Sequence, residues 1–508
     1  MNKAVKTVSF IAAATMLAKV MGMLRDIILA RSYGANFEID AYMAASRIPL
    51  LFFDLTLGAA IISTFIPVFN RYLQKGEDRA ASDFSNSFIN LILIISGTLC
   101  VLGIVFSGAL VNLIAPGYDT GVKLLTSHLL SIMLPAIVFT SLAYSFVGIL
   151  QSFGEFKIPA VISLVSNTAV IAYLLFFNKY FGIYGLAVSM LAGWGLQVAV
   201  LIPSLIKKKY RYRFILNFKD KGLKDVFILA LPVLISSWLQ PVCVLINTIF
   251  ASYFEEGSVA ALELANRLYI IVVGVFVFAI TNYTFPAMSK MSGRGDSDGF
   301  SDIADKSLRA MVAIIAPIMA GIMLLSNEVI TIVYARGEFD ERSVALTATA
   351  LFFYSVGMVS FGANEILNKC FYAMKDGKTP MYSTVLGIIC TVVFAFVLTK
   401  IFYLGIGGLA LGASLSSVAV SGVLFYKMQR ATGFLTGRKT GMFILKIIAS
   451  TALGVVAAYM AKSFFAPYHI FIKTTVTAAV GALAYFAVLT ALKTIPLPIP
   501  AKRSDKAK

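Results

Sequence analysis

The dominant pattern along the chain is an alternation of long apolar blocks with short polar segments. Each block has about 20 residues, the length that a helix needs to cross about 30 Å of hydrocarbon. The blocks lack the strict alternation of membrane-spanning β-strands. They predict about 14 transmembrane helices, centred near residues 17, 55, 98, 138, 167, 194, 240, 272, 314, 358, 390, 417, 452 and 482. The first block follows Lys3 and Lys6 and continues beyond the length of a signal peptide, so we interpret it as a membrane helix.

Lysine and arginine are concentrated in every second loop. The basic clusters follow the second, sixth, eighth, tenth and twelfth predicted spans, and the densest runs from Lys207 to Arg213. The intervening loops are poorer in basic residues or acidic, as at Glu255 and Glu256. By the positive-inside rule, the basic loops face the cytoplasm. We therefore expect a multi-pass membrane protein with both termini in the cytoplasm.

Short sequence signatures recur at an offset of about 220 residues. Ile158-Pro159 recurs as Thr379-Pro380, and Gly182-Ile-Tyr-Gly-Leu-Ala187 recurs as Gly405-Ile-Gly-Gly-Leu-Ala410. Six spans per unit preserve the orientation in the membrane, so the repeat is parallel. The predicted fold is all-α, with two six-helix bundles in residues 1–213 and 214–432. Residues 433–508 are expected to add two transmembrane helices and a basic C-terminal tail.

Composition excludes several classes of protein. The chain is 59% hydrophobic and 13% charged, which no water-soluble globular protein of 508 residues matches. The net charge of +18 is spread over the loops, so it indicates membrane topology and no nucleic-acid partner. Only two histidines are present, and no Gly-x-x-x-x-Gly-Lys loop is found, so we expect no metal, cofactor or ATPase activity.

One pair of acids leaves an enzymatic alternative open. Asp296-Ser-Asp298 resembles a glycosyltransferase metal motif, which a membrane enzyme of lipid-linked glycan assembly would use. A lone Asp-x-Asp in a loop rich in Gly, Ser and Asp is more typical of a solvated linker. We therefore expect a protein that is not an enzyme.

Charged residues lie inside several predicted spans. A lysine or arginine at mid-membrane costs about 2.5–3.5 kcal/mol on insertion scales, so such residues should pair or line a wet cavity. Two bundles that rock about a central site give alternating access. We therefore predict a substrate cavity between the bundles, lined by Lys19, Arg25, Asp26, Asp40, Arg47, Glu263 and Arg267. The alternative for Glu263 and Arg267 is a simple i,i+4 ion pair.

Several of these residues belong to a set of motifs with a familiar order and spacing. The set comprises Gly22-Met-Leu-Arg25-Asp26, Tyr33-Gly34-Ala35, Asp40-Ala-Tyr42, Arg47-Ile-Pro49, Phe65-Ile-Pro67-Val-Phe69, Ala115-Pro-Gly117, Arg336-Gly-Glu-Phe339 and Phe371-Tyr-Ala373. Together they resemble the signature of the MurJ/MviN family of lipid II flippases, in the multidrug/oligosaccharidyl-lipid/polysaccharide exporter superfamily. The resemblance extends through about 14 spans, the number expected for that family.

The resemblance implies a role in peptidoglycan biosynthesis and cell shape, and a place in the bacterial cytoplasmic (inner) membrane. The implied substrate is lipid II, an undecaprenyl-diphosphate-linked precursor that is carried from the inner to the outer leaflet. Arg25, Arg47 and Arg267 would line a cationic cavity, with Asp26 and Asp40 as their partners, and a groove near the last two helices would hold the lipid tail. The chain departs from the family where arginine is common: it has Lys19, and no basic residue at Phe53 or Asp54.

Those departures leave another substrate open, and a more distant alternative comes from the superfamily. A less cationic cavity suits another polyprenyl-diphosphate-linked oligosaccharide, and the same superfamily includes cation-coupled drug exporters. The sequence does not distinguish coupling to protons or sodium from use of the membrane potential. The expected partners are the glycolipid substrate, membrane lipid and, in a coupled mechanism, an ion.

Overall fold

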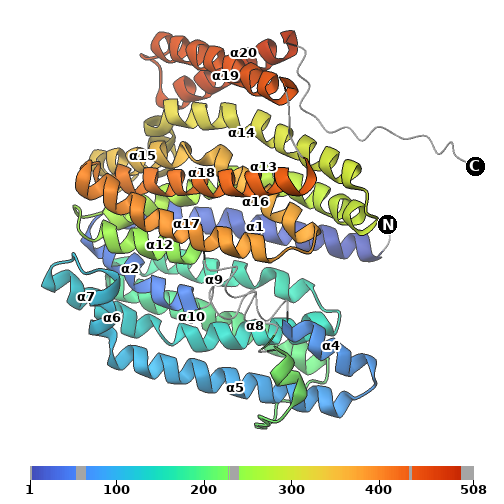
Figure 1. Ribbon diagram of the computed structural model, residues 1–508. Coiled ribbons are helices and arrows are strands. Elements are labelled where there is room, and N and C mark those ends of the chain that lie inside the picture. The colour runs from blue at the N-terminus through green and yellow to red at the C-terminus, as the bar shows by residue number, and fades with distance from the viewer. Residues whose placement is uncertain (1–2, 53–63, 227, 229–238, 434–437, 493–508) are drawn as a thin grey trace, which may run out of the picture. The chain divides into compact units, whose positions relative to one another are not determined.

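The computed structural model describes residues 3–52, 64–226, 228, 239–433 and 438–492, and every regular element within those ranges is helical. The chain divides into two compact units. Figure 1 labels their helices. The first, Met1–Ala260 with Tyr334–Ser343, contains α1 (Lys3–Tyr33), α2 (Phe37–Phe52), α4 (Ile66–Gln74), α5 (Asp78–Val105), α6 (Ser107–Ile114), α7 (Thr120–Met133), α8 (Ala136–Ser152), α9 (Lys157–Phe176), α10 (Asn178–Lys207) and α12 (Leu239–Ala251).

The second unit comprises Ala261–Val333 and Val344–Lys508. Its helices are α13 (Ser258–Gly293), α14 (Ser297–Tyr334), α15 (Glu341–Ser355), α16 (Met358–Ala373), α17 (Lys378–Phe396), the π-helix η3 (Val397–Ile401), α18 (Gly405–Thr432), α19 (Arg438–Phe464) and α20 (Ile470–Ala491). The first residues of α13 and of α15 and the last residue of α14 fall in the first unit. The predicted boundaries at 213 and 432 concern the sequence repeat and stay a prediction.

The predicted multi-pass helical fold is confirmed. Within the described residues, ten spans are long and apolar enough to cross a membrane, and the pair α15–α16 makes an eleventh with a bend of 50°. Of the other three predicted spans, the first is α1, which carries Lys19, Arg25 and Asp26. The spans centred on residues 55 and 240 fall partly on residues 53–63 and 229–238, outside the described residues, and their described parts are the end of α2 and α12.

The repeated signatures begin equivalent helices. Helix α9 starts at Lys157 and α17 at Lys378, about 220 residues later, and each has proline two positions further on. The backbone before each start is held by an acidic side chain: Glu155 accepts from the N–H of Lys157, and Asp376 accepts from that of Lys378, both at 3.0 Å. The same local sequence therefore produces the same helix start twice.

The glycines that open the second repeated signature share a backbone conformation. Gly182 has φ +51° and Gly405 has φ +54°, a region that disfavours residues with a Cβ. Gly182 breaks the helical conformation near the start of α10, and Gly405 opens α18. The backbone turn at each of these glycines sets the direction of the long helix that follows.

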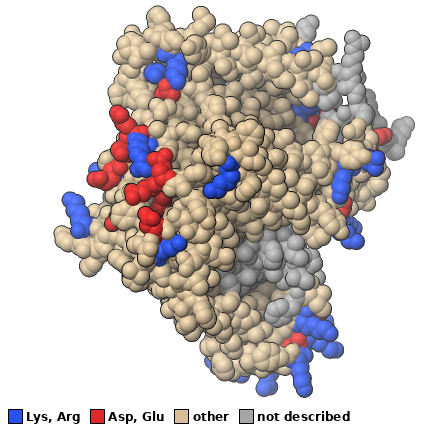
Figure 2. Space-filling view, turned by 60° about the vertical axis from the view of Figure 1, so that its left-hand side comes forward, with Lys and Arg blue, Asp and Glu red and all other residues tan. Residues whose placement is uncertain are grey.

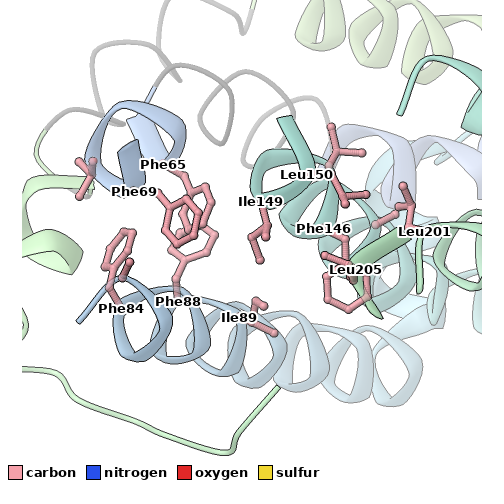
Figure 3. Close-up of a cluster of buried hydrophobic side chains, with 14 of the residues drawn as sticks. Phe65, Phe69, Phe84, Phe88, Ile89, Phe146, Ile149, Leu150, Leu201 and Leu205 are labelled. Atoms are coloured by element: carbon pink, nitrogen blue, oxygen red, sulfur yellow. The ribbon is translucent and has the colours of Figure 1, made fainter. Parts of the chain in front are cut away.

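The core of the first unit lies where α4, α5, α8 and α10 meet (Figure 3). The Phe65 ring, just before α4, lies 4.7 Å from that of Phe88 and 5.4 Å from that of Phe84, centroid to centroid. Ile149 of α8 and Leu201 of α10 are fully buried beside them. Because lipid is as apolar as these side chains, the cluster is held by close packing more than by exclusion of water.

The segment after α10 is bonded to α5 by two asparagines one turn apart. Asn86 Nδ2 donates to the carbonyl of Arg211 at 3.3 Å. Asn90 Nδ2 donates to the carbonyls of Arg213 at 3.2 Å and Ile215 at 2.9 Å. These side chains satisfy backbone acceptors that lie outside any helix, and so they fix an irregular segment.

The exposed surface suits a lipid environment. Large apolar side chains are exposed on the long helices, for example Val105 on α5, Phe176 on α9 and Leu453 on α19. In Figure 2, charged side chains gather in a few places and leave wide uncharged areas between them. Exposed apolar surface on this scale is expected where lipid replaces water.

Candidate functional site

The charged residues of α1 form a polar site with α9. Arg25 donates from Nε and Nη2 to Asp26 Oδ1, at 3.1 and 2.8 Å, and from Nη1 to Asn167 Oδ1 at 3.1 Å. Asn167 also donates to the carbonyl of Ala18 at 3.4 Å. Asp26 is buried, whereas the Arg25 side chain keeps 26% of its surface exposed. The structure therefore brings Arg25 and Asp26 together, and it adds Asn167.

The other cations of the first unit are placed differently. Lys19, almost two turns before Arg25 on α1, is exposed. Arg47, almost two turns after Asp40 on α2, is partly buried. Both take part in polar or electrostatic contacts.

Asp40 binds the start of α13. Its buried carboxylate accepts hydrogen bonds from the backbone N–H groups of Gly257 and Ala260, both at 2.8 Å. Unsatisfied N–H groups at a helix start favour a negative charge. Asp40 thus has a different partner from the arginine that the resemblance implies.

Three glycines with positive φ lie around Asp40, where backbones touch. A Cβ on Gly34 would overlap the carbonyl oxygen of Glu338. A Cβ on Gly257 would overlap the carbonyl oxygen of Ala35, and a Cβ on Gly337 would overlap the carbonyl oxygen of Arg31. The N–H of Glu338 donates to the carbonyl of Arg31 at 3.0 Å. The motifs at 33–35 and 336–339 therefore form one contact, although about 300 residues separate them in the sequence.

Polar side chains extend this contact. Arg342 pairs with Glu255 at 3.0 Å and donates to the carbonyl of Glu256 at 2.7 Å. The hydroxyl of Ser343 accepts from the N–H of Ala35 at 3.1 Å and donates to Asp340. These hydrogen bonds from Ser343 hold the pKa of Asp340 below its usual value.

The loop between α6 and α7 joins the same surface. The N–H of Gly117 donates to the Ser252 hydroxyl at 3.0 Å, and a Cβ on Gly117 would overlap the Ser252 carbonyl. We call these segments together the loop clasp: residues 31–40, 115–117, 252–260 and 334–343. Sequence analysis missed Ser252, Gly257 and Ser343, since their partners lie in other loops and no local motif marks them.

In the second unit, Glu263 and Arg267 form an i,i+4 pair near the start of α13. The Arg267 Nε lies 3.1 Å from Glu263 Oε1. Glu263 is buried, and Arg267 keeps 36% of its side-chain surface exposed. The pairing that we considered as an alternative is present, and it leaves the guanidinium accessible.

Asp296, one acid of the enzymatic alternative, has a structural role. Asp296 Oδ1 accepts from the N–H of Gly299 at 2.8 Å, which caps the first turn of α14. No group of three or more potential metal ligands occurs within the described residues. Helix capping is sufficient to explain Asp296.

Comparison with known proteins gives consistent matches. The model of the family described as "Lipid II flippase MurJ" matches residues 29–478. A probable lipid II flippase MurJ of Buchnera aphidicola subsp. Schizaphis graminum is 29% identical over 429 residues, which are 84% of this chain and 83% of that protein. The lipid II flippase MurJ of Burkholderia cenocepacia is 28% identical over 425 residues, 82% of each chain.

Solved structures share the fold. The structure titled "Lipid II flippase MurJ, inward closed conformation" has a TM-score of 0.82 at 23% identity and covers 95% of this chain and 98% of its own. An inward-facing multidrug resistance MATE family transporter of the MOP superfamily has a TM-score of 0.72 at 16% identity, with 84% and 98% coverage.

Proposed function

Because the chain belongs to the lipid II flippase MurJ family, we propose that it moves lipid II from the inner to the outer leaflet of the bacterial cytoplasmic membrane. The family's activity is transport and not an enzymatic reaction. The chain is similar to probable lipid II flippases over most of its length, whereas the drug transporters that share its fold are more distant in sequence.

The observation that supports the proposal most strongly is that hydrogen bonds hold the Arg25 guanidinium in place while part of it stays exposed. Asp26 and Asn167 take three of its five N–H groups and hold the guanidinium in place. The other two have no hydrogen-bond partner among the described residues, and the side chain is partly exposed, so it can receive an incoming group. A fixed guanidinium suits a diphosphate, since it can donate two charge-assisted hydrogen bonds to phosphate oxygens.

We propose the same role for Arg267 and Arg47, with Lys19 as a more exposed cation. Arg267 resembles Arg25 in that a buried acid holds it while part of its surface stays accessible. In both cases the acid lowers the cost of a cation in the membrane. Together the arginines would form the cationic cavity that receives the diphosphate, with Asp26 and Glu263 as positioning residues.

The loop clasp supports an alternating-access mechanism. With both termini in the cytoplasm, the loops that form it lie on the extracytoplasmic side. Release of substrate on the extracytoplasmic side requires the contacts of the loop clasp to separate. The hydrogen bond from the N–H of Gly257 to Asp40 is the buried contact at the centre of the loop clasp. The membrane potential assists export, because outward movement of an anion gains about 2.3 kcal/mol per charge per 100 mV.

The experiment is depletion of the protein from cells, followed by measurement of the lipid-linked intermediate that accumulates in the inner leaflet. Accumulated lipid II is the expected result. Accumulation of another polyprenyl-diphosphate oligosaccharide would show that this oligosaccharide, and not lipid II, is the substrate. Unchanged lipid intermediates, with increased retention of a cationic drug, would overturn the proposal.

A further inference from the structure

The segment that follows α10 carries five cations and no acid. They lie within residues 207–218 and are Lys207, Lys208, Lys209, Arg211 and Arg213. All five are exposed. Among the described residues, only Lys208 has a side-chain partner, the carbonyl of Phe153 at 3.0 Å. The other four side chains are therefore free to bind an anion. We call residues 207–218 the basic segment.

The basic segment begins where the lipid-facing surface of α10 ends. Ile202 and Ile206 are exposed apolar side chains on the last turns of α10, and Lys207 follows directly. Exposed apolar side chains suit hydrocarbon, whereas a lysine near a helix end keeps its ammonium group in the headgroup region. The change between neighbouring residues therefore places the start of the basic segment at the boundary between hydrocarbon and headgroups.

Hydrogen bonds to α5 fix the depth of the next part of the segment. The N–H of Arg213 donates to Asn86 Oδ1 at 3.2 Å, and the carbonyl of Ile215 accepts from Asn90 Nδ2 at 2.9 Å. Asn90 lies about 6 Å further along α5 than Asn86, and the exposed apolar side chains of α5 begin about 6 Å beyond Asn90, at Ile94. The chain from Arg213 to Ile215 thus runs toward the hydrocarbon and stops about one turn short of it.

Aromatic side chains are exposed at this depth. Phe214 has 75% of its surface exposed, and Tyr212 has 52%, although the Tyr212 hydroxyl donates to Asn90 Oδ1. Aromatic rings are favoured at the interface between membrane and water, where they contact the upper part of the acyl chains. Basic residues combined with exposed aromatic rings are typical of segments that bind an anionic membrane surface.

Lys209 indicates that the charge of the segment has a role beyond folding. Its φ is +58°, in the left-handed region, at the position after a helix end where glycine is usual. The N–H groups of Lys209 and Tyr210 donate to the carbonyls of Ile206 and Leu205, at 2.9 and 3.0 Å. Glycine would make the same hydrogen bonds without the strain of a Cβ. An anion bound to the lysine ammonium group would offset that strain.

We propose that the basic segment binds anionic phospholipids of the cytoplasmic leaflet, with its free cations on their phosphates and Phe214 at the top of their acyl chains. In the orientation proposed above, the segment faces the cytoplasm, where the membrane surface is negative. Asn86 and Asn90 are buried in the first unit, so lipid bound to the segment holds that unit at a fixed depth. The proposal concerns the surrounding bilayer and does not depend on which lipid-linked glycan is carried.

Fluorescence quenching in nanodiscs tests the proposal. The probe is Phe214→Trp in the full-length protein, with Trp194 and Trp238 replaced by phenylalanine. The nanodiscs contain phosphatidylglycerol and phosphatidylcholine in equal parts, with bromine on the upper acyl chains of one lipid or the other. Brominated phosphatidylglycerol should quench the introduced indole severalfold more strongly. Val105→Trp, at an exposed position at the other end of α5, is the control and should show no preference.

Charge variants identify the groups that bind the phosphates. Each basic residue near an anionic surface contributes about fivefold to binding, so Arg211→Gln with Arg213→Gln should remove most of the preference for phosphatidylglycerol. Lys123→Gln with Lys179→Gln removes the same charge from the opposite side of the membrane and is the matched control. Lys209→Gly should lower the preference while the thermal unfolding temperature stays at or above that of the wild type.

Three results would overturn the proposal. Equal quenching by the two lipids would show that the segment does not select anionic lipid. No quenching by either lipid would place Phe214 in water or against protein. A preference that one equivalent of undecaprenyl diphosphate abolishes would show that these cations bind the substrate and not the bilayer.

Discussion

The Asp40 carboxylate lies 2.8 Å from the backbone nitrogen of Gly257, a residue 217 positions further along the chain. The same carboxylate reaches Ala260, so a single buried side chain satisfies two N–H groups at the start of α13. A buried anion at this position holds the loop before α13 against α2.

The charge of Asp40 should control how firmly the loop clasp is closed. Asp40→Asn keeps the size of the side chain but removes the charge, and bonds to a charged group contribute about 1.5–3 kcal/mol. We expect faster hydrogen exchange of the amides in residues 255–262, measured by mass spectrometry in nanodiscs. Asp298→Asn, on α14, is the control. Unchanged hydrogen exchange in the Asp40 variant would show that the Asp40 carboxylate does not hold the loop clasp closed.

The close backbone contact at Gly257 should be equally sensitive. Gly257→Ala adds a Cβ that overlaps the carbonyl of Ala35, at a residue with φ +84°. Gly76→Ala is a matched control, because Gly76 also has positive φ but an added Cβ meets nothing within 4 Å. The control should lose about 1 kcal/mol of stability from backbone strain alone. A thermal unfolding temperature for Gly257→Ala no lower than that of the control would contradict the contact.

Asp40 also shows what sequence analysis could and could not predict. Periodicity and charge placed Asp40 among the functional residues, and the family motifs marked Gly34 and Gly337. Neither signal identifies which backbone amide a carboxylate binds, because Gly257 lies in a loop with no pattern of its own. The helices and most of the spans follow from the hydrophobic blocks, since block length directly sets span length. The offset of the repeat follows from the recurring short signatures.

The bend between α15 and α16 is a similar case. The apolar block centred on residue 358 predicts one continuous span, whereas the structure bends by 50° between Ser355 and Met358. A Cβ on Gly357 would overlap the backbone and side chain of Ser414, so the bend follows from a close approach to α18. Hydropathy averaged over a span does not register such a contact.

The cationic residues should act together on substrate. Alanine at Arg25, Arg47 or Arg267 removes a charge-assisted donor, which should weaken binding of lipid II about tenfold or more. Lysine should rescue each site only in part, because it keeps the charge but loses the planar fork. Lys306→Ala, which breaks an exposed pair with Asp302, is the control. Export at the wild-type rate by all three alanine variants, with normal membrane insertion, would reduce these arginines to helix-pairing residues.

The proposed orientation can be checked by cysteine labelling. In a background without the four natural cysteines, Arg213→Cys should resist impermeant thiol reagents in intact cells, and Glu256→Cys should react. Both residues are exposed, so burial does not protect either one. The reverse pattern of labelling would invert the topology and place the loop clasp in the cytoplasm.

Asp296 and Asp298 should be dispensable for transport. The double change to asparagine should leave lipid II export close to wild type and cost at most about 1 kcal/mol, because asparagine also caps helices well. Export and protein level should be measured together in a depletion strain. Lost export at a normal protein level would revive the enzymatic alternative.

The two asparagines on α5 begin the attachment of the connection that follows α10. Asn86 and Asn90 hold the backbone as far as Ile215, so a displacement of α5 carries this stretch along with it. The attachment continues beyond Ile215, because Arg71 pairs with Asp225 at 2.8 Å and Leu223 and Val226 are buried in the core of the first unit. Residues inserted before Val226 would therefore leave the reach of this connection unchanged.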